Sequence, residues 1–159
     1  MSKHDRYHGI VTAPWGALGY VIRDGALASI DYLPPRTATR PARDVLGRRI
    51  ETQLQRFFKD PSAGFDIPLQ TQGTAYQRRV WSAMQRIAPG ECVTYGELAR
   101  RLRSGPRAVG GACRANPIPL VIPCHRVVAA RGMGGYCGAP NEHMLSVKQW
   151  LLAHEAGQL

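Results

Sequence analysis

Residues 94–115 read TYGELARRLRSGPRAVGGACRA, and this stretch predicts two short helices joined by a tight turn. Thr94 precedes Glu97 by three residues, the spacing of a capping box at the start of a helix. The turn covers Arg103–Pro106, and its proline suits the first position of a second helix, which we expect over residues 107–115. Two short arginine-rich helices across a turn are typical of a helix-turn-helix.

The second of these helices carries two adjacent glycines, Gly110 and Gly111, in its interior. Each glycine costs about 1 kcal/mol of helix stability relative to alanine. The absence of a side chain therefore needs a reason. One interpretation is close approach of this helix to a nucleic-acid backbone or groove, and the other is tight packing against another helix of the chain.

The charge of the chain favours a polyanionic partner. Lys and Arg total 21 against 11 Asp and Glu, a net charge of +10, and 18 of the cations are Arg. Residues 1–73 carry a net charge of +3 and residues 74–159 one of +7, so we expect the basic surface in the second part. Arginine binds phosphate oxygens in pairs, and small basic domains usually meet nucleic acid. The alternative is a solvated, arginine-rich surface without a partner.

The first 73 residues predict a small α+β domain. Strand-like runs cover residues 9–13, 18–23 and 27–33, and Asp24-Gly25 between the last two is a strong hairpin signal. Apolar residues at helical spacing follow over residues 46–58. Residues 62–73 are interpreted as a linker.

Residues 74–159 predict a second, mainly helical domain. Thr74 and Gln77 form a capping box, and the helix behind it is expected to end at Pro89-Gly90. Residues 116–128 read NPIPLVIPCHRVV, interpreted as a short buried strand that ends at Pro123 and is followed by Cys124 and His125. An adjacent imidazole activates a thiol by lowering its pKa. Neighbours on a strand point to opposite faces, so the two side chains cooperate only through a turn at Pro123 or through a water.

A carboxylate completes a possible catalytic relay. Val147, Leu151 and Glu155 follow one another at helical spacing, which places Glu155 in line with an apolar stripe. A carboxylate there is costly unless it is paired, and His125 is a natural partner in a Cys–His–carboxylate arrangement. The simpler alternatives are a buried cysteine beside a structural histidine, and a Glu155 that points to solvent from the last helical turn.

Taken together, these motifs resemble the O6-alkylguanine-DNA alkyltransferases, the methylated-DNA–protein-cysteine methyltransferase family. The resemblance is close over residues 74–157 and holds only in pattern before them. Its segments, in chain order, are Val93–Gly96, Arg107–Ala112, Asn116-Pro117, Pro123–Val127, Gly135-Tyr136 and Trp150–Glu155. The resemblance implies an α/β protein with a ribonuclease H-like N-terminal domain, built on an antiparallel sheet, over residues 1–73. It implies a winged helix-turn-helix domain with the active site over residues 74–159.

The resemblance also implies the reaction and its residues. An alkyl group would pass from O6-alkylguanine in double-stranded DNA, and O4-alkylthymine is a further candidate substrate, to Cys124, irreversibly and once per molecule. The base would be flipped out from the minor-groove side, and no cofactor is needed. His125 would deprotonate Cys124 through a water, Glu155 would orient His125, and Asn116 would brace the turn. The other implied contacts are Tyr95, Pro119, Val127, Tyr136 and Cys137 with the base, and Arg107, Ala108, Gly110, Gly111, Arg114 and Thr94 with DNA, with Arg107 inserting into the duplex.

Several features are expected to be absent. The cysteines Cys92, Cys113, Cys124 and Cys137 include no Cys-x-x-Cys pair, and residues 1–73 hold no cysteine and only two histidines. We therefore expect no metal site and reduced thiols. With no signal peptide or membrane segment in the sequence, we expect a cytoplasmic protein, and a monomer.

Three other functions compete with this one. An alkyltransferase-like protein could bind damaged DNA without transfer, although such relatives lack the acceptor cysteine. A Cys–His hydrolase would not explain the basic helices, and a helix-turn-helix transcription factor would normally dimerise. The sequence also departs from the family pattern, because residues 137–146 replace a shorter glycine-rich loop.

Overall fold

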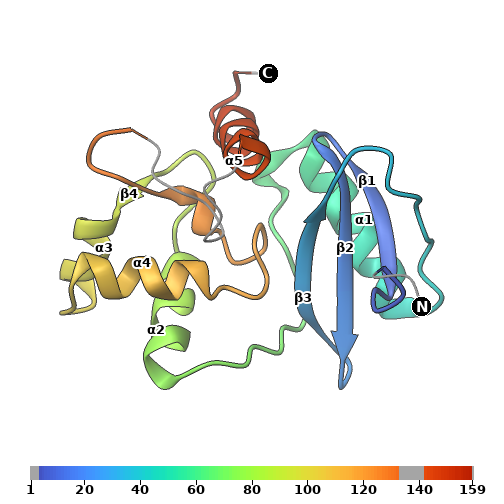
Figure 1. Cartoon of the computed structure of the whole chain (residues 1–159), viewed down its shortest axis with the longest axis horizontal. Helices are drawn as coiled ribbons and strands as arrows, with labels where there is room; N and C mark the ends of the chain where they lie inside the picture. The colour runs from blue at the N-terminus through green and yellow to red at the C-terminus, as the bar shows by residue number, and fades with distance from the viewer. Residues whose placement is uncertain (1–3, 133–141, 159) are drawn as a thin grey trace. The chain divides into compact units, whose positions relative to one another are not determined.

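The structure is a computed structural model that describes residues 4–132 and 142–158. The chain divides into two compact units, residues 1–71 and 72–159, which are described in turn (Figure 1). Among the described residues, no helix combines the length and apolar character needed to cross a membrane.

The first unit is built on a three-stranded antiparallel sheet. Its strands β1 (Gly9–Ala13), β2 (Gly16–Arg23) and β3 (Ala26–Leu33) lie in the order β1-β2-β3. Asp24 and Gly25 join the last two with φ values of 53° and 75°, the left-handed pair that a type I′ hairpin turn requires. The hairpin expected from the sequence is therefore present.

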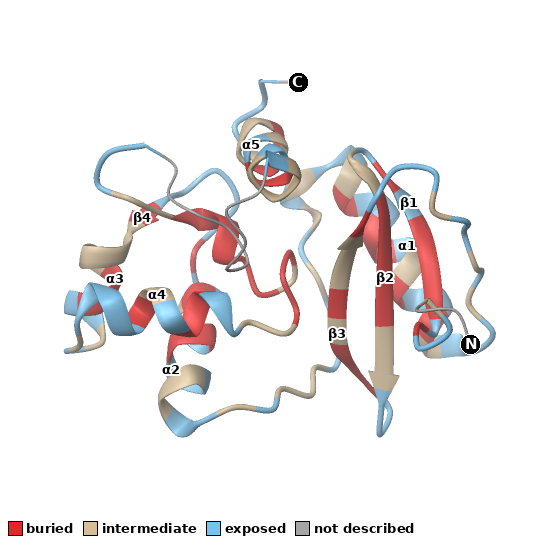
Figure 2. Ribbon diagram, viewed as in Figure 1, coloured by how far each residue is buried: buried red, intermediate tan, exposed pale blue. Residues whose placement is uncertain are grey.

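Helix α1 (Val45–Lys59) supplies the other half of this unit's core. The Asp44 side chain accepts a hydrogen bond from the Gly47 N–H and caps its start, and Asp60 and the 3₁₀ turn η1 (Pro61–Ala63) end it. Ile50, Leu54 and Phe57 of the helix are buried, as are many residues of the sheet (Figure 2). The Tyr20 hydroxyl of β2 donates a hydrogen bond to the Glu51 carboxylate, which ties sheet and helix together.

The second unit begins with three helices. They are α2 (Ala75–Met84), α3 (Tyr95–Arg101) and α4 (Pro106–Arg114), and the Thr74–Gln77 capping box starts the first. The expectation that α2 runs to Pro89 is wrong, because the helix ends at Met84. Ile87 is still buried, but it lies in the turn that follows the helix. In this turn the hydrogen bonds span three residues and no longer four: the Arg86 N–H donates to the Ala83 carbonyl, and the Ile87 N–H donates to the Met84 carbonyl.

Helix α2 holds α4 and the turn before it. The Trp81 Nε1–H donates to the Ala112 carbonyl at 2.8 Å, within the buried part of the unit. Tyr76 and Ser104 share a hydroxyl hydrogen bond of 2.7 Å, and the Arg79 guanidinium donates to the Leu102 carbonyl. One of these bonds reaches α4 itself, and the other two reach the end of α3 and the turn before α4.

The rest of the second unit consists of short pieces and a last helix. The 3₁₀ turn η2 (Cys124–Arg126) leads into β5 (Val127–Val128), which pairs in parallel with β4 (Val93–Thr94). Helix α5 (Glu142–Glu155) closes the unit.

The buried strand expected before Pro123 is not formed. Residues 118–122 make a turn instead, with the Ile122 N–H bonded to the Ile118 carbonyl and an isolated bridge between Pro119 and Ile122. Prolines cannot donate to a strand ladder, which is why so proline-rich a run curls rather than pairs.

Candidate active site

Cys124 is the first residue of the 3₁₀ turn η2, and 3% of its surface is exposed to solvent. Pro123 before it has φ −82° and ψ 68°, and the Arg126 N–H closes the turn on the Pro123 carbonyl at 3.0 Å. The chain therefore turns at Pro123. Such a turn is one of the two arrangements that would let the Cys124 and His125 side chains cooperate.

Asn116 braces the segment that leads to this cysteine. Its Nδ2 donates to the Ile122 carbonyl at 2.8 Å, and its Oδ1 accepts from the Ile118 N–H at 3.0 Å. The same Ile122 carbonyl accepts the Cys124 N–H at 2.8 Å, so one side-chain amide holds the backbone atom that positions the thiol. Leu120 inside this turn is buried with φ 77°, a left-handed conformation that a non-glycine residue keeps only when its surroundings enforce it.

Glu155 is the last residue of α5, and its side chain is 1% exposed. The helix ends just beyond it in a Schellman arrangement, in which Gly157 has φ 72° and the Gln158 N–H bonds to the Ala153 carbonyl at 2.9 Å. This closure keeps the last helical turn in place. Glu155 therefore points inward, as the stripe through Val147 and Leu151 predicts, and not to solvent.

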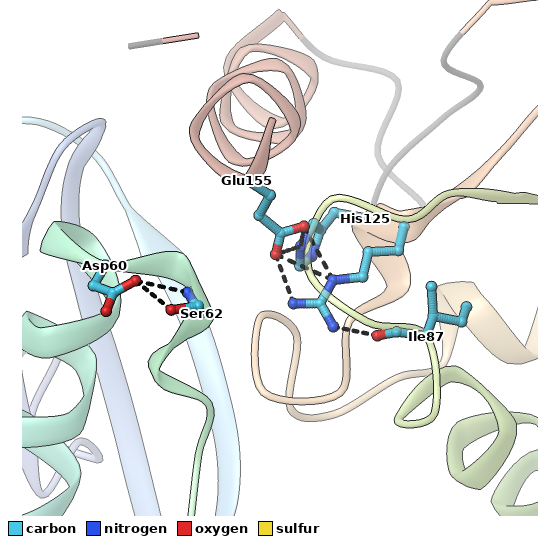
Figure 3. A network of polar contacts seen from close by, with 6 residues as sticks. Asp60, Ser62, Ile87, His125 and Glu155 are labelled. Carbon is cyan, nitrogen blue, oxygen red and sulfur yellow. Dashed lines mark hydrogen bonds and ion pairs between the residues drawn. The ribbon is translucent and has the colours of Figure 1, made fainter. Parts of the chain in front are cut away.

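The carboxylate of Glu155 meets two partners from the cysteine turn (Figure 3). The His125 Nε2 lies 3.1 Å from each of its oxygens. The Arg126 Nε donates to the same two oxygens at 3.0 and 3.1 Å, and its Nη2 donates to one of them at 2.6 Å. The guanidinium also donates through Nη1 to the Ile87 carbonyl.

This network decides the charge states. Burial by itself would raise the pKa of Glu155, but the hydrogen bonds from His125 and Arg126, together with the charge of Arg126, outweigh it and bring the pKa to about 2. Burial lowers the pKa of His125 below its ordinary value, against the opposing pull of Glu155 and with help from the charges of Arg126 and Lys148. The site at neutral pH is thus a carboxylate with a neutral imidazole, the state in which the imidazole can accept a proton.

Tyr95 opens α3 directly after β4, and the pairing of Val93 with Val127 and of Thr94 with Val128 ties that helix start to the residues after Cys124. Burial, followed by the charges of Cys113 and Cys124, raises the pKa of Tyr95 to about 12. The phenol therefore keeps its proton and can serve as a hydrogen-bond donor near the thiol.

Helix α4 has a buried face and an exposed face. Val109, Ala112 and Cys113 are buried, whereas Arg107, Ala108, Gly111 and Arg114 are exposed and Gly110 is partly exposed. A Cβ built on Gly110 or Gly111 meets no atom within 4 Å. Packing inside the chain therefore does not require these glycines, which leaves approach to an outside partner as the interpretation.

The remaining expected site residues have different outcomes. Pro119 and Val127 are both buried, and Val127 directly follows the cysteine turn. The Thr94 hydroxyl accepts the Glu97 N–H as the cap of α3. Tyr136 and Cys137 lie outside the described residues. Among residues 4–132 and 142–158, no three His, Cys, Asp or Glu side chains are grouped so as to hold a metal ion.

Sequence reasoning missed two cations of the site. Arg126 belongs to the motif over residues 123–127, and nothing local in the sequence indicates that it faces Glu155. Lys148 is fully buried, and its Nζ donates to the Val127 carbonyl at 2.9 Å. A signal for Lys148 does exist, since it stands seven residues before Glu155 and so shares its helix face.

Comparison with known proteins gives consistent matches. The family model described as "6-O-methylguanine DNA methyltransferase, DNA binding domain" matches residues 75–157. A methylated-DNA–protein-cysteine methyltransferase of Mycolicibacterium paratuberculosis is 39% identical over 153 residues, covering 91% of this chain and 89% of the relative. One from Haemophilus influenzae is 35% identical over 159 residues, covering 94% and 86%.

Solved structures extend the similarity to the fold of nearly the whole chain. The O6-methylguanine methyltransferase of Mycobacterium tuberculosis superimposes with a TM-score of 0.77 at 30% identity, covering 96% of this chain and 94% of that one. The Mycobacterium tuberculosis OGT in complex with DNA gives a TM-score of 0.77 at 30% identity, with 94% and 92% covered.

Proposed function

The chain belongs to the methylated-DNA–protein-cysteine methyltransferase (O6-alkylguanine-DNA alkyltransferase) family, and on this premise we propose that it repairs DNA by taking the alkyl group of O6-alkylguanine onto Cys124. The observation that carries the proposal is the buried His125–Glu155 pair, whose histidine directly follows Cys124 on the 3₁₀ turn. A hydrolase would use the same relay, but the family and the basic face of α4 favour DNA.

The proposed reaction is an in-line displacement. His125 takes the Cys124 proton through a water, and the resulting thiolate attacks the alkyl carbon. A sulfur–carbon bond forms while the carbon–O6 bond breaks, and the electron pair of that bond stays with the guanine. The Tyr95 hydroxyl donates to N3 of the leaving base. The thioether product has no route back to a thiol, so each molecule acts once and without a cofactor.

We also propose how the damaged base reaches the thiol. O6 of guanine is stacked inside a duplex, so attack by a protein group requires the nucleotide to be flipped out. Helices α3 and α4 would act as the helix-turn-helix of a winged domain, with the open glycine face of α4 in the minor groove and Arg107 inserted into the stack. Arg114 and Thr94 would hold phosphates without reading sequence. Pro119, Val127, Tyr136 and Cys137 would line the base pocket.

Other aspects of the proposal concern the whole protein. The sheet and helix of residues 1–73 would form the ribonuclease H-like domain and residues 74–159 the DNA-binding one. We also propose that the protein acts as a monomer. We propose a cytoplasmic location, and the reduced thiols of Cys92 and Cys113 suit it.

The test is intact mass and peptide mapping after the protein is mixed with excess duplex DNA that holds one O6-methylguanine. We expect a gain of one methyl group, located on Cys124, that stops there. Cys124→Ser should bind the same DNA and gain nothing. Binding without a mass change would support a damage-recognition protein instead, and turnover beyond one equivalent would support a hydrolase.

The relay has its own test. His125→Ala and Glu155→Gln should slow transfer while leaving affinity for the modified duplex nearly unchanged, because neither side chain lies on the exposed face of α4. The comparison needs single-turnover rates beside equilibrium binding. Equal losses of binding and rate would remove both residues from their assigned roles.

A further inference from the structure

Arg126 is a basic residue whose side chain faces inward. The side chain is 9% exposed, and three of its nitrogens are engaged: Nε and Nη2 with Glu155, and Nη1 with the Ile87 carbonyl. Its charge is thus unavailable to a phosphate backbone, although it belongs to the arginine-rich half of the chain. The transfer mechanism above leaves this cation without a role.

The position of Arg126 matters because Glu155 also meets His125. A buried carboxylate that faces only an imidazole favours the imidazolium, since an opposite charge nearby stabilises the protonated form. An imidazolium cannot take a proton from a thiol. With the guanidinium on the same two oxygens, the carboxylate is already neutralised before His125 is counted.

We propose that Arg126 is a positioning residue that reserves the His125 imidazole for the Cys124 proton by pairing with the Glu155 carboxylate. The proposal rests on the function proposed above. In the resting site, His125 Nε2–H donates to Glu155, and the other ring nitrogen receives the proton that leaves Cys124 Sγ. After the transfer the imidazolium shares the carboxylate with Arg126, so charge is conserved within the site.

Other charged and titratable groups raise or lower the pKa of His125. Lys148 of α5 adds a second positive charge and lowers the pKa of His125, in the same sense as Arg126. Glu155, also from α5, acts in the opposite sense, and Cys124 precedes His125 on its own turn. Cys92, from the segment before β4, is subject to the charges of Glu155, Lys148 and Arg126. Arg126 is bonded to the carboxylate that His125 contacts, and the Lys148 Nζ donates to the Val127 carbonyl.

The test is the pH dependence of single-turnover transfer, measured with excess protein on a duplex that holds one O6-methylguanine. In Arg126→Gln we expect the acidic limb of the profile to move up by about one pH unit. The rate then falls about tenfold near pH 6 and recovers most of its value near pH 8.5. Arg126→Lys, which keeps the charge, should stay closer to the wild-type profile. Arg86→Gln removes the same charge from an exposed site next to Ile87 and should leave the profile unchanged.

Two results would overturn the proposal. One is a uniform fall in rate for Arg126→Gln with an unshifted pH profile, which is what a merely structural role produces. The other is an imidazolium signal for His125 at about pH 7 in the wild-type protein, read by nitrogen NMR of labelled histidine. The NMR measurement needs no variant, so it decides the matter even if Arg126→Gln fails to fold. It also needs no substrate, so a protein that transfers nothing would refute the proposed function without touching this result.

Discussion

Asn116 braces the segment before Cys124 with both ends of its side-chain amide. Its amide satisfies one backbone donor and one backbone acceptor on both sides of the turn. No other side chain is bonded to the Ile122 carbonyl among the described hydrogen bonds. The position of the Cys124 backbone therefore depends on the side-chain amide of a neighbouring residue.

Asn116→Ala should lower the free energy of unfolding by about 1–3 kcal/mol, because it leaves the buried Ile118 N–H without its acceptor. Urea unfolding with and without the substitution measures this, and the transfer rate should fall as well. Asn116→Asp is the matched control, since it keeps an acceptor for Ile118 and loses the donor to Ile122. Unchanged unfolding midpoints in both variants would contradict the bracing role.

Glu155 gives the site a predictable acid sensitivity. Its pKa in the folded protein is lowered from 4.5 to about 2, so its ionised form stabilises the fold above pH 4.5. That contribution is lost as the pH falls toward 2. The difference in unfolding free energy between the wild type and Glu155→Gln should therefore shrink over this window. Unfolding curves at a series of acidic pH values measure it, and a constant difference would argue against an ionised, paired Glu155.

At the scale of elements, α4 combines low helix propensity with an exposed small-residue face. Its glycines meet no neighbouring atom within 4 Å on the side where a Cβ would lie. These glycines lower the stability of the helix and allow no closer packing within the chain. Contact with an external partner best explains their presence. Helix α2 is bonded to the turn before α4 through Ser104 and to the last turn of α4 through the Ala112 carbonyl.

Gly111→Ala separates stability from DNA contact. We expect the free energy of unfolding to rise by up to about 1 kcal/mol, because alanine favours helix and the new methyl group meets open space. Affinity for duplex DNA should fall at the same time. Ser82→Ala, on an exposed position of α2, is the control that gains helix propensity without changing binding. If Gly111→Ala binds duplex DNA as tightly as the wild type does, DNA does not contact this face of α4.

Arg107 tests base extrusion at the same helix. If it fills the space left by the flipped nucleotide, Arg107→Ala should slow transfer from a duplex far more than from a single strand, where no stack must be opened. Single-turnover rates on the two forms of one oligonucleotide give the comparison. Arg78→Ala, at an exposed position of α2, removes the same charge and should affect the two forms alike. An equal effect of Arg107→Ala on both forms would exclude an inserting role.

For the whole molecule, the net charge of +10 makes association with DNA an electrostatic event. Each neutralised phosphate releases counterions, so the logarithm of the binding constant should fall linearly with the logarithm of salt concentration. Arg114→Ala should lower this slope by about one, as expected for one lost phosphate contact. Titrations at several salt concentrations measure both quantities. A flat salt response would mean that the charge is incidental to binding.

Local signals were sufficient for much of the molecule. The Asp24-Gly25 turn, the Thr74 and Thr94 caps and the helix over residues 46–58 each depend on side chains within a few residues of one another. That is why the sequence predicts them. The stripe that ends in Glu155 also predicts an inward carboxylate, because helical spacing is itself a local property. The matched motifs indicate the family for the same reason.

Other features depend on the tertiary structure. The turn over residues 118–122 replaces an expected strand, because a strand needs a partner and these prolines have none to bond to. Arg126 contacts Glu155 across 29 residues of sequence, and the packing of α5 on the cysteine turn makes this basic residue the partner of a buried carboxylate. The open space beside Gly110 and Gly111 likewise depends on how other segments pack around α4. The sequence alone thus determined which groups could react. The tertiary structure decided their charge states and neighbours, because burial and charge pairing depend on segments that are distant along the chain.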